Sequence, residues 1–305
     1  MNKNKKYLFG PIPSRRFGLS LGVDLTPYKT CSQDCVFCQL GRTTHKTCER
    51  REYVPTREVI AELDEWLRTG AYADCITLSG SGEPTLHSRF GEVLEFIRTH
   101  TNIPAVLLTN GSLLHIPEVC RGARLARIVK VSLSCWDQAS YEWVNRPAPN
   151  CTFDQLIHGQ KTFRTVFDGV LWMEVFVVAG MNATGPQIQK IADHAKLIKP
   201  NRLHLNTSVR PPAEDYVGNL PLARLAFLCD FFNPPAQIIS EVIVKKRAAS
   251  SLDKEELLSI LGRRPCTANQ ITQGLGLHIN AVSKALGDLL RTGKIKEIRK
   301  HNTVY

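Results

Sequence analysis

The sequence predicts an α/β fold, in which a partial, TIM-like (β/α)6 barrel is followed by a small, mostly helical domain. From about residue 19 to 240, short aliphatic runs alternate with amphipathic segments, a pattern typical of parallel strands joined by helices. Glycine-rich and polar motifs follow most of these runs, where parallel sheets and (β/α)8 barrels bind their ligands. After residue 245 the pattern becomes helical and basic.

The first domain is expected to span residues 1–244 and to contain six parallel strands. Its apolar runs are rich in valine, isoleucine and leucine, which favour buried strands. The predicted strands are 19–25, 75–79, 105–109, 128–134, 170–178 and 203–209. The helices predicted between them are 56–68, 89–100, 117–121, 153–163 and 187–198.

The second domain is expected to span residues 245–305, with 245–251 as a linker after Pro234-Pro235. A first helix is predicted at 253–261, and Thr267 can cap a second that runs to about residue 275. A third helix places four apolar residues on one face, Val282, Leu286, Leu289 and Leu290, and ends at Gly293. Segments 295–299 and 303–305 can then pair as a hairpin. Three helices and a hairpin resemble a winged helix-turn-helix domain.

The net charge of +11 is concentrated at the two ends of the chain. Residues 245–305 contain twelve Lys or Arg against five Asp or Glu, a surplus of seven, and residues 1–16 contain five basic residues and no acid. This asymmetry favours a polyanionic partner, RNA or DNA.

No apolar run approaches the roughly 20 residues of a membrane span, and no secretory leader is evident, so a cytoplasmic protein without membrane contact is expected.

Three of the ten cysteines lie within eight residues, in the segment Cys31-Ser32-Gln33-Asp34-Cys35-Val36-Phe37-Cys38 after the first strand. Three thiolates on one loop can bind three irons of a cubane cluster and leave the fourth iron open. The alternatives are a zinc site completed by His45 and Cys48, or cysteines that are simply packed in the fold. The seven other cysteines are scattered and are expected to be isolated, reduced thiols.

With Phe37 before the last cysteine, this segment matches the CxxxCxΦC signature, and residues 7–240 resemble the radical SAM superfamily. The resemblance implies a [4Fe–4S] cluster bound by Cys31, Cys35 and Cys38. It also implies that S-adenosylmethionine (SAM) binds the open iron and is cleaved reductively to a 5′-deoxyadenosyl radical. The electron would come from an external donor such as ferredoxin or flavodoxin.

The resemblance also assigns SAM-binding positions at the strand ends. The segment Ser79-Gly80-Ser81-Gly82-Glu83-Pro84 resembles the superfamily's GGE motif, whose backbone and acid hold the SAM amino group. Glu83 would supply the carboxylate for this ammonium group. Polar groups at later strand ends would contact the rest of SAM or the substrate. These positions are Asn110, Ser132, Ser134, Asn206 and Arg210. Turn formation and helix capping are the alternative roles for the glycines, Asn110 and the serines.

Within the superfamily, the fragments at 9–18, 22–27, 145–147 and 209–212 resemble the branch that contains tRNA wyosine-base synthase. That synthase acts on a modified guanine in tRNA, so the resemblance favours a base in tRNA or another RNA as substrate, with a peptide or a small molecule as the alternatives. Synthases that close the tricyclic base have a second cluster on upstream cysteines, and no cysteine precedes Cys31 here. We therefore do not expect pyruvate-dependent ring closure.

A second interpretation is an iron–sulfur redox-sensing regulator that binds DNA through the winged helix-turn-helix. The third helix of that domain would present outward residues suited to a nucleic-acid groove. They are Asn280, Ser283, Lys284, Gly287 and Arg291. A protein-docking role for the same domain is the alternative.

Overall fold

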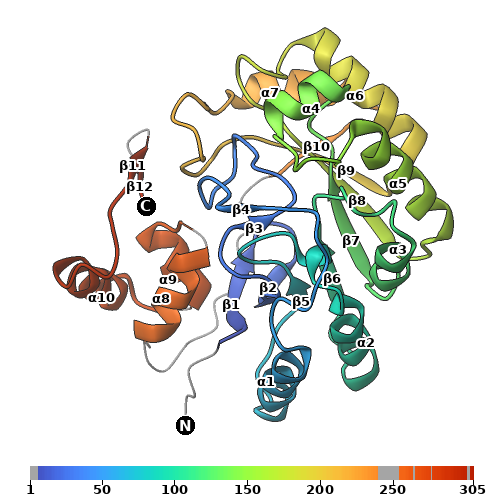
Figure 1. Cartoon of the computed structure of the whole chain (residues 1–305). Helices are drawn as coiled ribbons and strands as arrows, with labels where there is room; N and C mark the ends of the chain where they lie inside the picture. Colours follow the sequence, from blue (N-terminus) through green and yellow to red (C-terminus); the bar gives the residue numbers. More distant parts are fainter. Residues whose placement is uncertain (1–5, 240–253, 264, 276, 301–302) are drawn as a thin grey trace.

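The computed structural model describes residues 6–239, 254–263, 265–275, 277–300 and 303–305. Its main feature is a curved eight-stranded sheet in the order β1-β2-β5-β6-β7-β8-β9-β10 (Figure 1). All neighbours from β2 to β10 pair in parallel, whereas β1 pairs antiparallel with β2. The carboxyl ends of the parallel strands therefore meet along one edge, where ligands of such sheets bind.

The six predicted strands are confirmed, and each ends one to three residues earlier than expected. They are β2 (Gly18–Val23), β5 (Cys75–Leu78), β6 (Ala105–Leu108), β7 (Ile128–Ser132), β8 (Val170–Phe176) and β9 (Arg202–Asn206). Strands β1 (Leu8–Ser14) and β10 (Gln237–Ile238) extend the sheet at its two edges and were not predicted. A separate two-stranded sheet joins β3 (Thr30–Cys31) to β4 (His45–Lys46).

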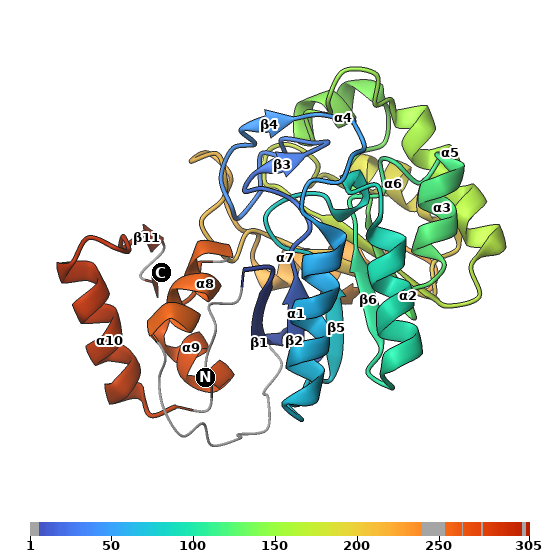
Figure 2. The same ribbon diagram turned by 60° about the horizontal axis from the view of Figure 1, so that its bottom comes forward.

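The helices cover the outer face of the sheet (Figure 2). The five predicted ones are α1 (Thr56–Arg68), α2 (Phe90–His100), α3 (Pro117–Ala123), α5 (Phe153–Val166) and α6 (Gly185–Ile198). Two short helices, α4 (Gln138–Val144) and α7 (Leu222–Cys229), and a 3-10 turn at Pro84–Leu86 were not predicted. Within the described residues, no helix has the length and apolarity to cross a membrane.

The two faces of the sheet differ in polarity because side chains alternate along each strand. Apolar residues such as Leu21, Ile76 and Val129 join the main core beneath the helices. Polar residues lie on the other face, where the Ser20 and Thr77 hydroxyls are 2.6 Å apart. The interior of the open barrel is thus polar and suited to a charged ligand.

The C-terminal part contains three helices and a two-stranded sheet, in the predicted order. They are α8 (Lys254–Arg263), α9 (Ala268–Leu275), α10 (Ile279–Arg291), β11 (Arg299–Lys300) and β12 (Thr303–Val304). As predicted, Thr267 caps α9: its hydroxyl accepts a hydrogen bond from the Gln270 amide at 3.1 Å. The predicted linker at 245–251 lies outside the described residues. We call the described part of this region, residues 254–305, the C-terminal module.

Candidate functional site

The cysteine loop begins at the end of β3 and is fixed against the carboxyl ends of the barrel strands. Its Val36 amide donates to the Val144 carbonyl at 3.1 Å, and its Ser32 carbonyl accepts from the Ala148 amide at 2.8 Å. Phe37 stacks on Phe176, the last residue of β8, with ring centroids 4.1 Å apart. These contacts explain the aromatic residue of the signature: it anchors the loop on the sheet.

Each of the three cysteine sulfurs has a side-chain N–H donor. Lys29 Nζ lies 3.2 Å from Cys38 Sγ, Asn145 Nδ2 lies 3.3 Å from Cys35 Sγ, and Asn110 Nδ2 lies 3.7 Å from Cys31 Sγ. Donors to the sulfurs stabilise thiolates and tune the potential of the cluster that they bind. Of the three donors, only Asn110 was predicted to be a site residue.

The donor set fits an iron–sulfur cluster better than a single metal ion. Burial and the neighbouring Cys38 sulfur raise the pKa of the Cys35 thiol to about 12, and burial also raises the pKa of Cys31. Cationic iron would reverse this effect, because metal ions bind the thiolate form. Among the described residues, no three His, Cys, Asp or Glu side chains converge to hold one metal ion. Cysteines that bind separate irons of a cubane need not converge in this way.

One pair of cysteines corrects the expectation of isolated thiols. Cys48 and Cys151, 103 residues apart in the sequence, form a disulfide. The bond ties the segment after the cysteine loop to the start of α5. It also removes Cys48 from the predicted zinc alternative, because its sulfur is already bonded. The seven scattered cysteines were therefore not all isolated, and sequence spacing gave no sign of this pairing.

The turn after β5 brings Glu83 beside the cysteine loop. Its carboxylate is buried and accepts four hydrogen bonds: from the Thr85 amide at 3.1 Å, the Thr85 hydroxyl at 2.6 Å, the Thr109 hydroxyl at 2.6 Å and the Asn110 amide at 2.7 Å. Burial raises the pKa of Glu83, and these hydrogen bonds oppose that shift. Glu83 thus joins the carboxyl ends of β5 and β6, next to Cys31.

The two glycines of this turn are required because a side chain at either position would clash with neighbouring atoms. A Cβ on Gly82 would lie 1.7 Å from the Thr30 carbonyl oxygen. Gly80 has φ +134°, and a Cβ there would lie 2.5 Å from the Asp24 carboxyl carbon. Only glycine allows such close approach in this conformation. The turn is therefore packed tightly between the end of β2 and the residue that precedes Cys31.

The predicted serines lie at the end of β7 and engage neighbouring protein groups. Ser132 Oγ accepts from Lys130 Nζ at 3.2 Å. Ser134 follows the strand, is buried, and its hydroxyl accepts from the Phe176 amide at 2.9 Å. Ser134 is thereby tied to β8, whereas Ser132 lies beside Lys130, a partly buried cation of the barrel interior.

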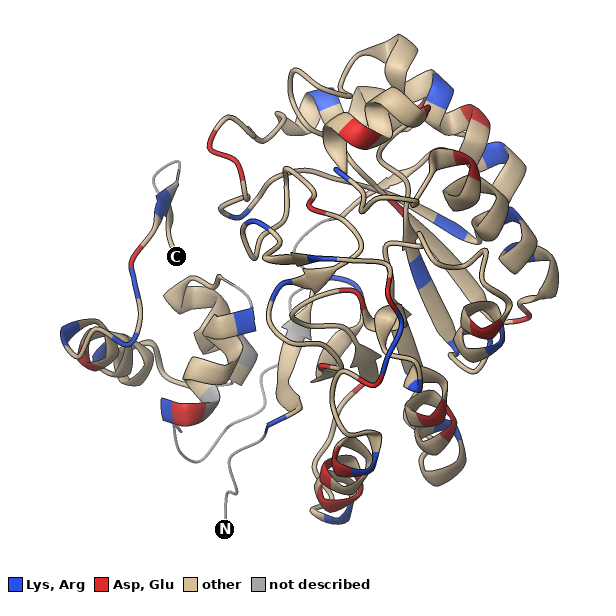
Figure 3. Cartoon of the chain, viewed as in Figure 1, with Lys and Arg blue, Asp and Glu red and all other residues tan. Residues whose placement is uncertain are grey.

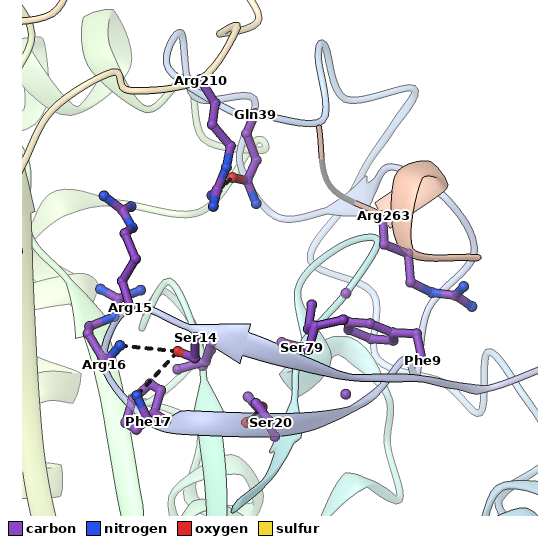
Figure 4. A pocket seen from close by; sticks show the side chains of 15 residues that line it. Phe9, Ser14, Arg15, Arg16, Phe17, Ser20, Gln39, Ser79, Arg210 and Arg263 are labelled. Carbon is purple, nitrogen blue, oxygen red and sulfur yellow. Dashed lines mark hydrogen bonds between the residues drawn. The ribbon is translucent and has the colours of Figure 1, made fainter. Parts of the chain in front are cut away.

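The two predicted residues at the end of β9 face different groups. Asn206 Nδ2 donates to Glu174 Oε1 at 2.7 Å. Arg210 Nη1 donates to Gln39 Oε1 at 2.6 Å, on one side of a cavity of about 200 Å³ (Figure 4). The same cavity is lined by Ser79 and Gly80. Arg210 and the glycine turn therefore border one space.

A charged group in the barrel interior was not predicted. The Glu174 carboxylate pairs with Arg16, and with Lys130 at 3.4 Å. Burial alone would raise its pKa, but the two cations and Asn206 hold the pKa well below its usual range. Burial and the charge of Arg16 lower the pKa of the adjacent His204 to about 4. The interior thus has fixed charges close to the predicted SAM-binding positions.

Comparison with known proteins matches residues 25–195 to the family model described as the radical SAM superfamily. The matched span contains the cysteine loop, the glycine turn and the carboxyl ends of β5–β8. The chain belongs to the radical SAM superfamily. This is a family of enzymes, and membership implies a [4Fe–4S] cluster and SAM as cofactors, as the sequence predicted.

Relatives of this radical SAM protein include a UPF0026 protein of Methanocaldococcus jannaschii, 35% identical over 227 residues that cover 74% of this chain and 70% of that protein. A protein named GTPase Obg from Brachyspira hyodysenteriae is 32% identical over 308 residues. They cover 97% of this chain and 45% of that protein, so this chain spans less than half of that relative. The fold is similar to TYW1 with a lysine–pyruvate adduct bound, with a TM-score of 0.53, 15% identity, and coverage of 75% of this chain and 76% of that one.

The contact between Asn145 and Cys35 predicts an effect on the redox potential. Asn145→Leu removes one N–H donor from the Cys35 sulfur, which destabilises the more negative, reduced cluster. A hydrogen bond of about 1.4 kcal/mol corresponds to a potential roughly 60 mV lower. A redox titration of the reconstituted protein, followed by electron paramagnetic resonance, measures it. Asn102→Leu, at an exposed turn before β6, is the control and should leave the potential unchanged.

Proposed function

We propose that Cys31, Cys35 and Cys38 hold the [4Fe–4S] cluster, and that the enzyme cleaves SAM reductively in order to modify a base of tRNA or another RNA in the cytoplasm. One observation carries the proposal: three thiols on one loop, each with an N–H donor, lie beside the buried Glu83. A ferredoxin or flavodoxin is the proposed electron donor.

When bound, the cluster and SAM supply a 5′-deoxyadenosyl radical that can abstract hydrogen from a substrate. The residues of the chain prepare this chemistry. Lys29, Asn110 and Asn145 stabilise the charge on the sulfurs through hydrogen bonds. We propose that Gly82 lets the backbone approach the SAM amino group and that Glu83 fixes the shape of the turn around it. The remaining predicted SAM contacts are Gly80, Asn110, Ser132, Ser134, Asn206 and Arg210.

The C-terminal module supports an RNA substrate. Basic residues occur on α8, on α10 and at the β11–β12 end of the module (Figure 3). A groove of about 670 Å³ lies between part of the module and the barrel and is lined by Val209 and Arg210 of the barrel and by Asn269 and Gln270 of the module. Polar and cationic groups around such a groove suit a polyanion. We propose that the module, as a winged helix-turn-helix domain from about residue 245, positions RNA near Arg210.

The SAM chemistry is tested with anaerobically reconstituted protein. We expect about four irons per chain, the content of one cubane cluster, and formation of 5′-deoxyadenosine when a strong reductant is added. Protein that binds iron but forms no 5′-deoxyadenosine would contradict the proposed reaction. Protein whose bound metal is zinc alone would contradict the ligand assignment.

The RNA substrate is tested by mass spectrometry of nucleosides from purified tRNA and other RNA of a strain that lacks the gene. We expect one modified nucleoside to disappear and to return when the wild-type gene is restored. The gene with Cys35→Ala is the matched control and should not restore it. If all RNA nucleosides are identical in the two strains, the RNA substrate is excluded and the SAM chemistry is unaffected.

A DNA-binding regulator is the second candidate. Helix α10 favours it, because Asn280, Ser283 and Lys284 are exposed on this helix, which lies on the side of the module away from the barrel (Figure 1). Such a regulator needs the cluster but not SAM. A specific DNA footprint that Glu83→Ala leaves unchanged would favour this function over the enzymatic use of the module.

A further inference from the structure

The C-terminal module is packed on the edge strand of the barrel. Phe9 and Ile12 of β1 share an apolar core with Leu257 and Ile260 of α8 and with Ile271 of α9. Figures 1 and 2 both show α8 and α9 beside β1. The module therefore borders the barrel at the open side that six (β/α) units leave, and its side chains can reach groups of the barrel interior.

Arg263, the last residue of α8, makes this contact. Its Nε lies 3.1 Å from Asp24 Oδ2, its Nη2 donates to the Lys6 carbonyl at 3.2 Å, and its guanidinium lies over the Phe9 ring at 5.1 Å. The Asp24 side chain is 7% exposed and that of Arg263 17%, so the ion pair is largely shielded from water. Arg263 and Phe9 line the cavity of about 200 Å³ together with Ser79 and Gly80 (Figure 4).

Asp24 connects this arginine to the glycine turn. Its Oδ1 accepts from the Ser81 amide at 3.1 Å and its Oδ2 accepts from the Ser81 hydroxyl at 2.5 Å. The carboxyl group also occupies the space next to Gly80 that a side chain would need. One carboxylate thus bridges an arginine of the C-terminal module and the turn that leads to Gly82 and Glu83.

We propose that Arg263 is a positioning residue for the SAM-binding turn, so that the C-terminal module is a structural part of the SAM site. This inference rests on the proposed function, in which the turn binds SAM. Removing one partner of a largely shielded ion pair leaves the other charge uncompensated, and the group left behind has to find a new partner. Such a movement of Asp24 alters the two hydrogen bonds that shape the turn at Ser81.

The experiment compares Arg263→Gln with a control on the same helix. Lys254→Gln removes an exposed cation from the first turn of α8, where it pairs with Asp288. Each reconstituted protein is assayed for iron content, for the dissociation constant of SAM by equilibrium dialysis without oxygen, and for 5′-deoxyadenosine formation. We expect Arg263→Gln to retain its iron and to bind SAM about tenfold more weakly, the size of a typical coupling between sites. Lys254→Gln should match the wild type.

Two further variants separate positioning from simple loss of stability. Asp24→Asn should weaken SAM binding by a similar factor, and the double variant no more than either single one, because both changes break the same connection. Arg263→Lys retains the charge and should bind SAM with an affinity between those of Arg263→Gln and the wild type. It replaces Arg263→Gln in the comparison if that variant folds poorly. Unchanged SAM affinity in folded Arg263→Gln or Asp24→Asn would overturn the inference. Wild-type protein that binds no SAM would instead overturn the proposed function.

Discussion

Replacing Cys35 with alanine is expected to abolish both cluster binding and SAM cleavage. Three thiolates are the whole protein ligand set proposed for the cubane, and Cys35 is the central one on the loop. Changing a group that only supports a metal ligand typically costs 10–100-fold in affinity or activity. Loss of the ligand itself should therefore reduce 5′-deoxyadenosine formation by more than roughly 100-fold. Iron analysis and product quantification on anaerobically purified protein measure both effects.

The control for this substitution is Cys120→Ala, a partly buried cysteine on α3, which should leave iron content and cleavage unchanged. The two variants remove the same group from the same chain, so a difference between them reports on the loop alone. If Cys35→Ala still binds about four irons and forms 5′-deoxyadenosine, Cys35 is not a ligand and the arrangement of the loop has to be reassigned.

The sequence predicted the parallel strands because each contains a short run of aliphatic residues whose side chains are buried in the fold. It did not predict β1, which contains Gly10, Pro11 and Pro13, residues that usually interrupt strands. The structure places β1 at the edge of the sheet, where proline is tolerated because fewer backbone amides must pair. The short helices α4 and α7 escaped prediction because two turns of helix give little periodicity.

The cysteine loop was predictable because its three ligands are close in sequence and their spacing reflects local geometry. The groups around it were not, since they come from distant parts of the chain. Asn145 meets Cys35 across 110 residues, and Arg263 meets Asp24 across 239. No local sequence pattern indicates contacts between residues so far apart in the chain. Lys29 lies close to the loop in sequence, but a lone lysine before a turn does not indicate a donor to sulfur.

Replacing Glu83 with alanine is expected to weaken both the fold and the SAM site. The carboxylate is 2% exposed and accepts from the Thr85 and Asn110 amides. Without it, the buried Thr85 amide and the partly buried Asn110 amide lose their acceptor, and each such loss costs about 1–3 kcal/mol. The free energy of unfolding should therefore fall by at least roughly 2 kcal/mol. SAM should bind at least about tenfold more weakly, because the ends of β5 and β6 are no longer joined beside Cys31.

Denaturant unfolding and equilibrium dialysis of SAM, both without oxygen, measure the two effects separately. Glu95→Ala, on the exposed face of α2, is the control and should change neither. Glu83→Gln retains the shape of the side chain but turns an acceptor into a donor that faces other donors, so it should resemble the alanine variant in SAM affinity. If Glu83→Ala lowers stability while SAM affinity stays at the wild-type value, the carboxylate supports the strand ends alone and the SAM amino group is bound elsewhere.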